Sequence, residues 1–494
     1  MKTHAVATCT RLGLAAVLWM LPAVAIAVPR PTVEGPVTGG LGSPVLVTTT
    51  FDLADVGYLM AEFFISGTAS SYLPVGPLTP DGRWTVAAAA SAPYKTRILV
   101  YRPARAGKFN GTVVVEWLNV TAGIDVGIEW VNTHVELIRE GFAWVGVSAQ
   151  IAGVEGGGLV IPGGAPSPLK KADPERYGSL SHPGDSFSYD IFSQAAEAVR
   201  HHEGADLFGG RPVRAVIAVG DSQSAYRLEN YINAIQPLTH TFDGFLVHSR
   251  GSFGVFLSES PQPAVPVPSS ILRTDLDAPV LMVETETDLV NATFGLLFLP
   301  VRQADTDRVR TWEVAGTSHI DAYLNGAGLS DLGDSPGVGN LVVTTATPFG
   351  NCTAPINAGP QHFVLHGAMH ALDRWVRRGI APPVAPRLEA VTSPAIAIVR
   401  DQHGNALGGV RTPQVDVPIA TLSGQGQVGG PFACGLDGTT IPFGPETLRA
   451  LYPTHAAFTT AFRAATTAAE RAGFLVQRDA RLLRRWAARS AIGR

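Results

Sequence analysis

The chain has 494 residues, of which 46% are hydrophobic and 16% charged, and its formal net charge at pH 7 is −4. This composition excludes an intrinsically disordered, collagen-like or coiled-coil chain. Without a long basic run, the sequence gives no reason to expect a nucleic-acid partner or attraction to an anionic membrane surface. We therefore expect a small or neutral molecule as the partner.

Residues 1–27 predict a secretory signal peptide. Basic residues precede an apolar run from Leu12 to Ile26, which ends in the small-x-small pattern Ala25-Ile26-Ala27 that signal peptidase cuts. The run has about 15 residues and two prolines follow it, whereas a transmembrane helix needs ~20 apolar residues. The exported chain would have 467 residues (494 − 27) and no integral membrane span. We expect it to be secreted or periplasmic.

The next elements predict the start of an α/β sheet. Residues 28–92 are rich in Gly, Pro and Thr with short β-type runs such as residues 45–48, and they predict a β-rich lead-in. Residues 96–101, 112–117 and 142–147 are apolar strands. Between the last two, apolar residues recur at helical spacing from Ile128 to Ile138 and stop at Gly141, which predicts a helix with a glycine cap.

The same alternation continues toward the C-terminus. Strands are expected at 215–219, 245–247, 280–283 and 311–314, with helices at 191–201 and 225–235, and further helices at 445–451, 456–471 and 479–491. Strands alternating with helices predict a doubly wound, mostly parallel α/β sheet of the α/β-hydrolase type with long loop insertions. We expect one domain over residues 28–494, comprising the lead-in (28–92), a catalytic core (93–382) and a C-terminal cover (383–494).

Gly220-Asp221-Ser222-Gln223-Ser224 lies directly after a strand and before a helix. This is the setting of the Gly-x-Ser-x-Gly nucleophile elbow, with Ser224 replacing the last glycine by another small residue. A turn of this kind raises the serine hydroxyl above the sheet and directs the helix N-terminus toward it. Ser222 is therefore the predicted nucleophile, against the alternative of an ordinary serine in a strand-to-helix turn.

Two later loops supply a base and an acid for Ser222. His319 follows the strand that ends at Val314, where the base of this architecture is expected. In the loop after the preceding strand, Asp288 is the favoured acid, and Glu286 is the alternative. The resulting chain order is Ser…Asp…His.

Two backbone N–H groups are expected to bind the oxyanion. Gln223 follows the nucleophile and supplies one of them, and Asn119 or Val120, in the loop after the strand that ends at Trp117, supplies the other. Asn119-Val120-Thr121 also matches a glycosylation sequon. Because a glycan there would block the pocket, we interpret this match as chance.

Three further features of the sequence concern a disulfide, the substrate pocket and a possible metal site. Cys352 and Cys434 are the cysteines that remain after signal removal, and in an oxidising compartment they predict a disulfide, with two free thiols as the alternative. His248 and Arg250 end a strand at the carboxyl edge of the sheet and are possible substrate-pocket residues, although Arg250 could instead hold a loop. His362, His366 and His370 recur every four residues and could bind a metal, but apolar residues mingle with them, and we predict a core helix and no metal.

The sequence resembles the secreted alpha/beta hydrolase domain family of the α/β-hydrolase superfamily. The likeness covers nearly the whole exported chain. It is carried by TRILVYRPARAGKFNGTVVVEWLNVTAG (from Thr96), YGSLSHPGDSFSYDIFSQAAEAVR (from Tyr177), GDSQSAYRLENYINAI (from Gly220), FDGFLVHSRG (from Phe242), VETETD (from Val283) and WEVAGTSHIDAY (from Trp312). The resemblance implies the α/β-hydrolase fold and the same triad of Ser222, Asp288 and His319.

Together these patterns predict an exported serine hydrolase that cleaves a carboxylic ester through a Ser-His-Asp triad and needs no cofactor. One alternative is the same triad acting as an amidase or acyltransferase. Another is a carbohydrate- or wall-binding protein that keeps the fold without the chemistry. A metal-dependent hydrolase built on the helix with His362 is a third.

Overall fold

Ten strands pair into one sheet in the computed structural model, which describes residues 27–157, 166–201, 203–292, 295–339 and 351–494. The predicted signal peptide, up to residue 26, lies outside the described residues. The ten strands are β1 (Thr32–Glu34), β2 (Tyr58–Pro74), β3 (Val86–Pro103), β4 (Thr112–Trp117), β5 (Ala143–Val147), β6 (Glu203–Gly204), β7 (Ala215–Asp221), β8 (Gly244–His248), β9 (Val280–Thr285) and β10 (Val309–Val314).

The strand order is β10-β9-β8-β7-β4-β5-β3-β2-β1-β6. The six strands from β10 to β5 are parallel, and β3, β2 and β1 continue the sheet with antiparallel pairing. All residues of β4, β5, β7, β8 and β9 are buried, as expected for parallel strands covered on both faces. The predicted doubly wound, mostly parallel fold is confirmed.

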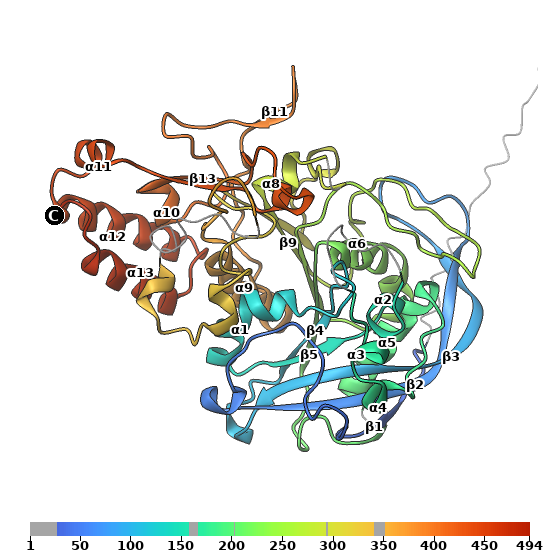
Figure 1. The fold of residues 1–494 in the computed structure, drawn as a ribbon. Helices are drawn as coiled ribbons and strands as arrows, with labels where there is room; N and C mark the ends of the chain where they lie inside the picture. The colour runs from blue at the N-terminus through green and yellow to red at the C-terminus, as the bar shows by residue number, and fades with distance from the viewer. Residues whose placement is uncertain (1–26, 158–165, 202, 293–294, 340–350) are drawn as a thin grey trace, which may run out of the picture.

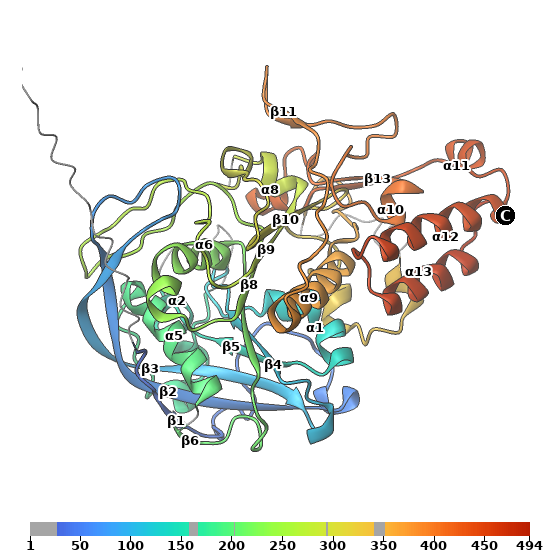
Figure 2. The same ribbon diagram turned by 180° about the vertical axis from the view of Figure 1, so that it is seen from behind.

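Helices cover both faces of the sheet. They are α1 (Ile128–Glu140), α2 (Ile151–Val154), α3 (Leu169–Ala172), α4 (Pro174–Tyr177), α5 (Ser188–Arg200), α6 (Gln223–Asn230), α7 (Gln236–Thr239), α8 (Glu286–Val290) and α9 (Gln361–Arg378). Figures 1 and 2 show α1 and α9 on one face and α5 and α6 on the other. Neighbouring residues divide between the two cores: Val113 packs toward α5 and α6, and Val114 packs toward α1 and α9.

The segment before residue 93 differs from its description as a lead-in of short β-type runs. Strands β2 and β3 have 17 and 18 residues, pair with each other over most of their length, and join the main sheet through β5. The boundary expected between residues 92 and 93 therefore lies inside β3. Part of the reason is that the first half of β3 is largely exposed and rich in alanine, so it lacks the apolar run that marks a buried strand.

The C-terminal segment packs beside α9 (Figure 1). It contains the helices α10 (Pro413–Asp416), α11 (Pro445–Leu451), α12 (His455–Arg471) and α13 (Gln477–Arg489) and the strand pairs β11 (Ala390–Val391) with β12 (Ala397–Ile398) and β13 (Ala420–Ser423) with β14 (Thr439–Pro442). Phe458, Phe462 and Trp486 share an apolar core with Phe363 of α9. Val410 also bridges Val314, so this segment covers part of the open edge of β10.

Within the described part of the chain, no helix combines the length and the apolar character that crossing a membrane would require.

A buried arginine on β3, Arg97, binds to several segments from the first half of the chain. The Arg97 guanidinium is fully buried and lies 2.5 Å from Asp125 Oδ2 and 3.4 Å from Glu62 Oε1. It also donates to the carbonyl oxygen of Val45 and to the hydroxyl of Ser148. Asp125 belongs to the loop between β4 and α1, so Arg97 fixes that loop against the sheet.

Replacing Arg97 tests how much its ion pairs contribute to the free energy of unfolding. Arg97→Met would leave the buried Asp125 carboxylate without its cation, whereas Glu62 would keep its pair with Arg176. We expect the free energy of unfolding to fall by about 3–5 kcal/mol. Lys95→Met, two residues earlier, removes a half-exposed pair with Glu34 and should cost less than about 1 kcal/mol. Urea unfolding followed by circular dichroism measures both, and equal losses would contradict the assignment.

Candidate active site

Ser222 forms the turn between β7 and α6. Its φ of 56° and ψ of −120° place a non-glycine residue in a strained conformation, as the predicted elbow requires. The close approach of strand and helix explains the small neighbours: a Cβ on Gly220 would lie 3.0 Å from Leu228 and 3.1 Å from the carbonyl oxygen of Ser224. Ser222 itself is partly exposed.

The structure brings Ser222, His319 and Asp288 into one hydrogen-bonded chain. His319 Nε2 lies 2.8 Å from Ser222 Oγ, and His319 Nδ1 lies 2.6 Å from Asp288 Oδ1. The other oxygen of Asp288 accepts from the backbone N–H and the hydroxyl of Thr285, the N-cap of α8. Because the carboxylate only accepts, Nδ1 carries the proton and Nε2 is left to accept the serine O–H.

Electrostatics support this arrangement. Burial alone would raise the pKa of Asp288, but His319 and the donors on Thr285 outweigh it and hold the pKa below its usual value. Burial would likewise lower the pKa of His319, but Asp288 outweighs it and raises the pKa. The acid therefore stays ionised and favours an imidazolium at His319.

Glu286, the alternative acid, points away from His319. Its Oε1 accepts from the backbone N–H of Gly316, and its Oε2 accepts from Arg400 and from the N–H of Gly424. Glu286 thus joins the loop that carries His319 to two parts of the C-terminal segment. The geometry favours Asp288 as the partner of His319.

The three candidate oxyanion donors, Gln223, Asn119 and Val120, differ in whether their backbone N–H groups are free. The N–H groups of Gln223 and Val120 donate to no acceptor within the described residues. The N–H of Asn119 is already used, because it donates to the carbonyl oxygen of Val126 at 3.1 Å. The Asn119 side chain donates instead to the carbonyl oxygen of Asp221 and is buried, which also leaves the sequon asparagine inaccessible. Gln223 and Val120 remain as the candidate pair.

His248, expected in the substrate pocket, lies instead in a buried cluster beneath the elbow. Its Nδ1 is 2.6 Å from Glu129 Oε1 and 3.1 Å from Asp221 Oδ1, and the ring is fully buried. Burial would lower the pKa of His248, but the two carboxylates outweigh it and raise the pKa to about 9. The carbonyl oxygen of His248 accepts from the Ser222 N–H at 3.0 Å. The cluster therefore links α1, β7 and β8 behind the nucleophile, which corrects the pocket assignment.

Arg250, the other expected pocket residue, is also fully buried. Its guanidinium lies 3.1 Å from Glu229 Oε2, donates to the carbonyl oxygen of Ser270 and stacks over the ring of Phe298. The positive charge is already matched inside the protein. Arg250 holds a loop, the alternative reading of the sequence, and is not placed to meet a substrate carboxylate.

The three histidines of α9 have separate partners. His362 stacks on Tyr323 with ring centroids 3.7 Å apart, His366 Nδ1 lies 2.6 Å from Asp479, and His370 lies near Glu136. Within the described residues, two other groups have metal-binding side chains close together, Cys352-Cys434-Asp437 and Glu129-Asp221-His248. The first contains a disulfide, and the ligand atoms of the second already pair with one another.

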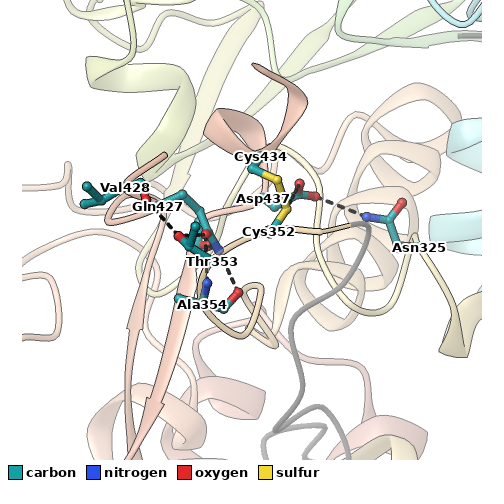
Figure 3. The surroundings of a disulfide bond; sticks show 9 residues. Asn325, Cys352, Thr353, Ala354, Gln427, Val428, Cys434 and Asp437 are labelled. Carbon is teal, nitrogen blue, oxygen red and sulfur yellow. Dashed lines mark hydrogen bonds between the residues drawn. A yellow bond between two sulfur atoms is a disulfide. The ribbon is translucent and has the colours of Figure 1, made fainter. Parts of the chain in front are cut away.

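Cys352 and Cys434 form the predicted disulfide, with Asp437 beside it (Figure 3). The residues that follow Cys434 contact both loops of the Ser-His-Asp chain. The carbonyl oxygen of Gly435 accepts from Asn291, at the end of α8, and that of Leu436 accepts from the N–H of Ile320, next to His319. Burial raises the pKa of the adjacent Asp437 to about 6. The sequence did not predict these contacts of Gly435 and Leu436, because no local pattern links residues so far apart in the chain.

A Ser-His-Asp chain at the carboxyl edge of a mostly parallel sheet defines an α/β-hydrolase architecture. Residues 33–485 match the profile described as Alpha/beta hydrolase domain, and the chain belongs to this family of hydrolases. No curated protein matches the chain.

Solved structures to which the chain is similar include XC6422 from Xanthomonas campestris, described as an α/β serine hydrolase without lid. It is 14% identical with a TM-score of 0.26, and the match covers 52% of this chain and 87% of that one. A glucuronoyl esterase from Solibacter usitatus is 12% identical with a TM-score of 0.28, over 58% of this chain and 81% of that one. At these values neither structure informs on the substrate.

The raised pKa of His319 predicts a pH dependence. The imidazole must be neutral to accept the serine proton, so kcat/KM for an ester should rise with pH and level off above an inflection that lies higher than the ~6.5 of an ordinary histidine. Burial and His248 lower the pKa of His319, whereas Asp288 and Asp221 raise it. Asp288→Asn should move the inflection of the residual activity to lower pH; an inflection unchanged in that variant would contradict the pairing.

The disulfide should stabilise both the fold and the contacts that Gly435 and Leu436 make with the loops of the site. In Cys352→Ser/Cys434→Ser the closed loop is lost, and we expect the free energy of unfolding to fall by about 2–4 kcal/mol. Because Gly435 and Leu436 brace the two loops, kcat/KM should fall as well at temperatures where the protein stays folded. Urea unfolding and ester hydrolysis test this, with reductant-treated wild type as the matched comparison. Unchanged stability in both samples would refute it.

Proposed function

We propose that this hydrolase is an exported serine esterase that cleaves carboxylic esters through an acyl-enzyme on Ser222. The observation that carries the proposal is the continuous chain from Ser222 Oγ through His319 to the ionised Asp288. The partly exposed serine at the tip of a strained turn supports the same role. Export rests on the signal-like N-terminus, and the disulfide is consistent with it.

Each group has a defined role in the proposed reaction. Ser222 Oγ attacks the ester carbonyl carbon while His319 Nε2 takes its proton, and His319 then returns that proton to the leaving alcohol. Water repeats the sequence on the acyl-enzyme and releases the acid. Asp288 keeps His319 in the required tautomer and stabilises the imidazolium. The N–H groups of Gln223 and Val120 bind the oxyanion, each worth ~3–4 kcal/mol in the transition state.

The surroundings favour an uncharged ester. Several charged side chains around the site are already matched: Glu286 pairs with Arg400, Arg250 with Glu229, and Arg227 with Asp185 and Glu259. Exposed apolar side chains are present on two loops near the site. Phe253 packs over Gly295, whose carbonyl oxygen binds Tyr226 of α6, and Phe432 lies in the segment that precedes the Leu436 contact.

Ser222→Ala tests the proposal, and the same pentapeptide offers a matched control. Removing the nucleophile should lower kcat for an ester on the order of 10⁶-fold. Ser224→Ala, two residues later, removes a buried hydroxyl with no hydrogen-bond partner in the described structure, and it should leave kcat within about threefold of wild type, because an unpaired hydroxyl contributes little.

A panel of esters of varied acyl length, with matched amides, provides the measurement. A fluorophosphonate probe should label wild type and Ser224→Ala but not Ser222→Ala. Retention of more than a tenth of the activity by Ser222→Ala, or an unlabelled wild type, would reject the esterase proposal. Faster cleavage of amides than of their matched esters would assign the same residues to an amidase.

A further inference from the structure

A groove lined almost entirely by arginines lies between α13, the end of α1 and the loop at Gly333. Its volume is about 630 Å³, and its lining residues are Gly333 and five arginines: Arg139, Arg478, Arg481, Arg484 and Arg485. No carboxylate is among them. Positive charge is thus gathered on one face of a chain whose net charge is negative, which is why overall composition gave no sign of it.

The five arginines differ in how their charge is matched. Arg139 pairs with the buried Asp479 at 2.5 Å, and Arg484 pairs with Glu470. Arg478, Arg481 and Arg485 are exposed, and none of them pairs with a carboxylate in the described structure. Three guanidinium groups of this groove are therefore without an ion pair in the described structure. Arg478 and Arg481 also line a neighbouring cavity that contains Glu136, Glu140 and Glu470, and Glu470 is already paired with Arg484.

This arrangement disfavours α13 as an isolated element. Arg481 and Arg485 are four residues apart on the same helix face, and like charges at this spacing destabilise a helix by about 0.2–0.5 kcal/mol. Arg478 lies in the first turn, where the helix dipole disfavours a cation. An anion bound in the groove would offset both the repulsion between the arginines and the unfavourable interaction with the helix dipole. The charge pattern is therefore consistent with an anion-binding site.

We propose that this groove binds phosphate groups of an anionic ligand. The planar fork of arginine donates two parallel hydrogen bonds to a phosphate, and several arginines around one space match a ligand with more than one negative oxygen. A phospholipid headgroup and a soluble phosphorylated molecule share this chemistry.

The groove is separate from the Ser-His-Asp chain. Helix α1 begins at Ile128, beside the loop with Val120, and Arg139 lies eleven residues farther along it. At 1.5 Å per residue the two ends are roughly 17 Å apart. The site at Ser222 can therefore work with the groove empty, and loss of binding and loss of ester hydrolysis are distinguishable.

Binding should be measured with the full exported chain and two probes. Phosphatidylglycerol vesicles present a lipid phosphate, with phosphatidylcholine vesicles as the zwitterionic comparison, and inorganic pyrophosphate presents a soluble one. The test variant is Arg478→Gln/Arg481→Gln/Arg485→Gln. The control is Arg449→Gln/Arg463→Gln/Arg471→Gln, which removes the same charge from exposed positions on α11 and α12 outside the groove.

We expect wild type and the control to bind at least one phosphate probe, more weakly as salt rises, while the test variant binds on the order of 100-fold more weakly, at about fivefold per arginine. Binding to phosphatidylglycerol alone identifies a lipid headgroup as the ligand, and binding to pyrophosphate alone identifies a soluble phosphate. Either result supports the proposal that the groove binds phosphate groups. Binding to neither, or equal losses in the two variants, overturns it. Circular dichroism melting checks that both variants are folded, and their ester hydrolysis should equal that of wild type.

Discussion

The backbone of Ser222 is the constraint on which the rest of the site depends. A non-glycine residue with its φ of 56° and ψ of −120° costs about 1–3 kcal/mol, so the surrounding structure must hold it in place. On one side the Ser222 N–H is bound by the carbonyl oxygen of His248, on the neighbouring strand, and on the other side α6 begins at Gln223. Because the turn is fixed at both ends, His319 meets a hydroxyl with a defined position.

Buried carboxylates fix the loops around this turn. Asp125 holds the loop with Val120 through Arg97, Glu129 and Asp221 enclose His248 beneath the elbow, and Glu286 joins the His319 loop to Arg400. Each carboxylate connects segments that are distant in sequence. Such pairs add specificity to the fold more than they add stability, since burial costs much of what the attraction supplies. Charge pairing inside the protein thus connects the loops around the elbow to the rest of the fold.

The parts of the fold that follow from local sequence were predictable. The parallel strands are continuous apolar runs, and the positions of Ser222, Asp288 and His319 follow from where β7, β9 and β10 end. Long-range partners were not predictable. The exposed half of β3 shows no burial pattern, and nothing local to His248 indicates that Glu129, 119 residues earlier, would draw it under the elbow instead of into a pocket. The arginines of the groove likewise converge only after α13 packs near α1.

The contacts of residues 400–437 give the site an order of assembly. A nascent chain that had emerged only as far as α9 would contain Ser222, Asp288 and His319. It would still lack Arg400 and Gly424, which bind Glu286, and Leu436, which holds the N–H next to His319. The braces of the His319 loop are therefore made last and are locked by a bond between Cys352 and Cys434 that needs an oxidising compartment. In the proposed export, this bond would close only after the chain has left the compartment of its synthesis, so the site would be fully braced in a different place from where it is made.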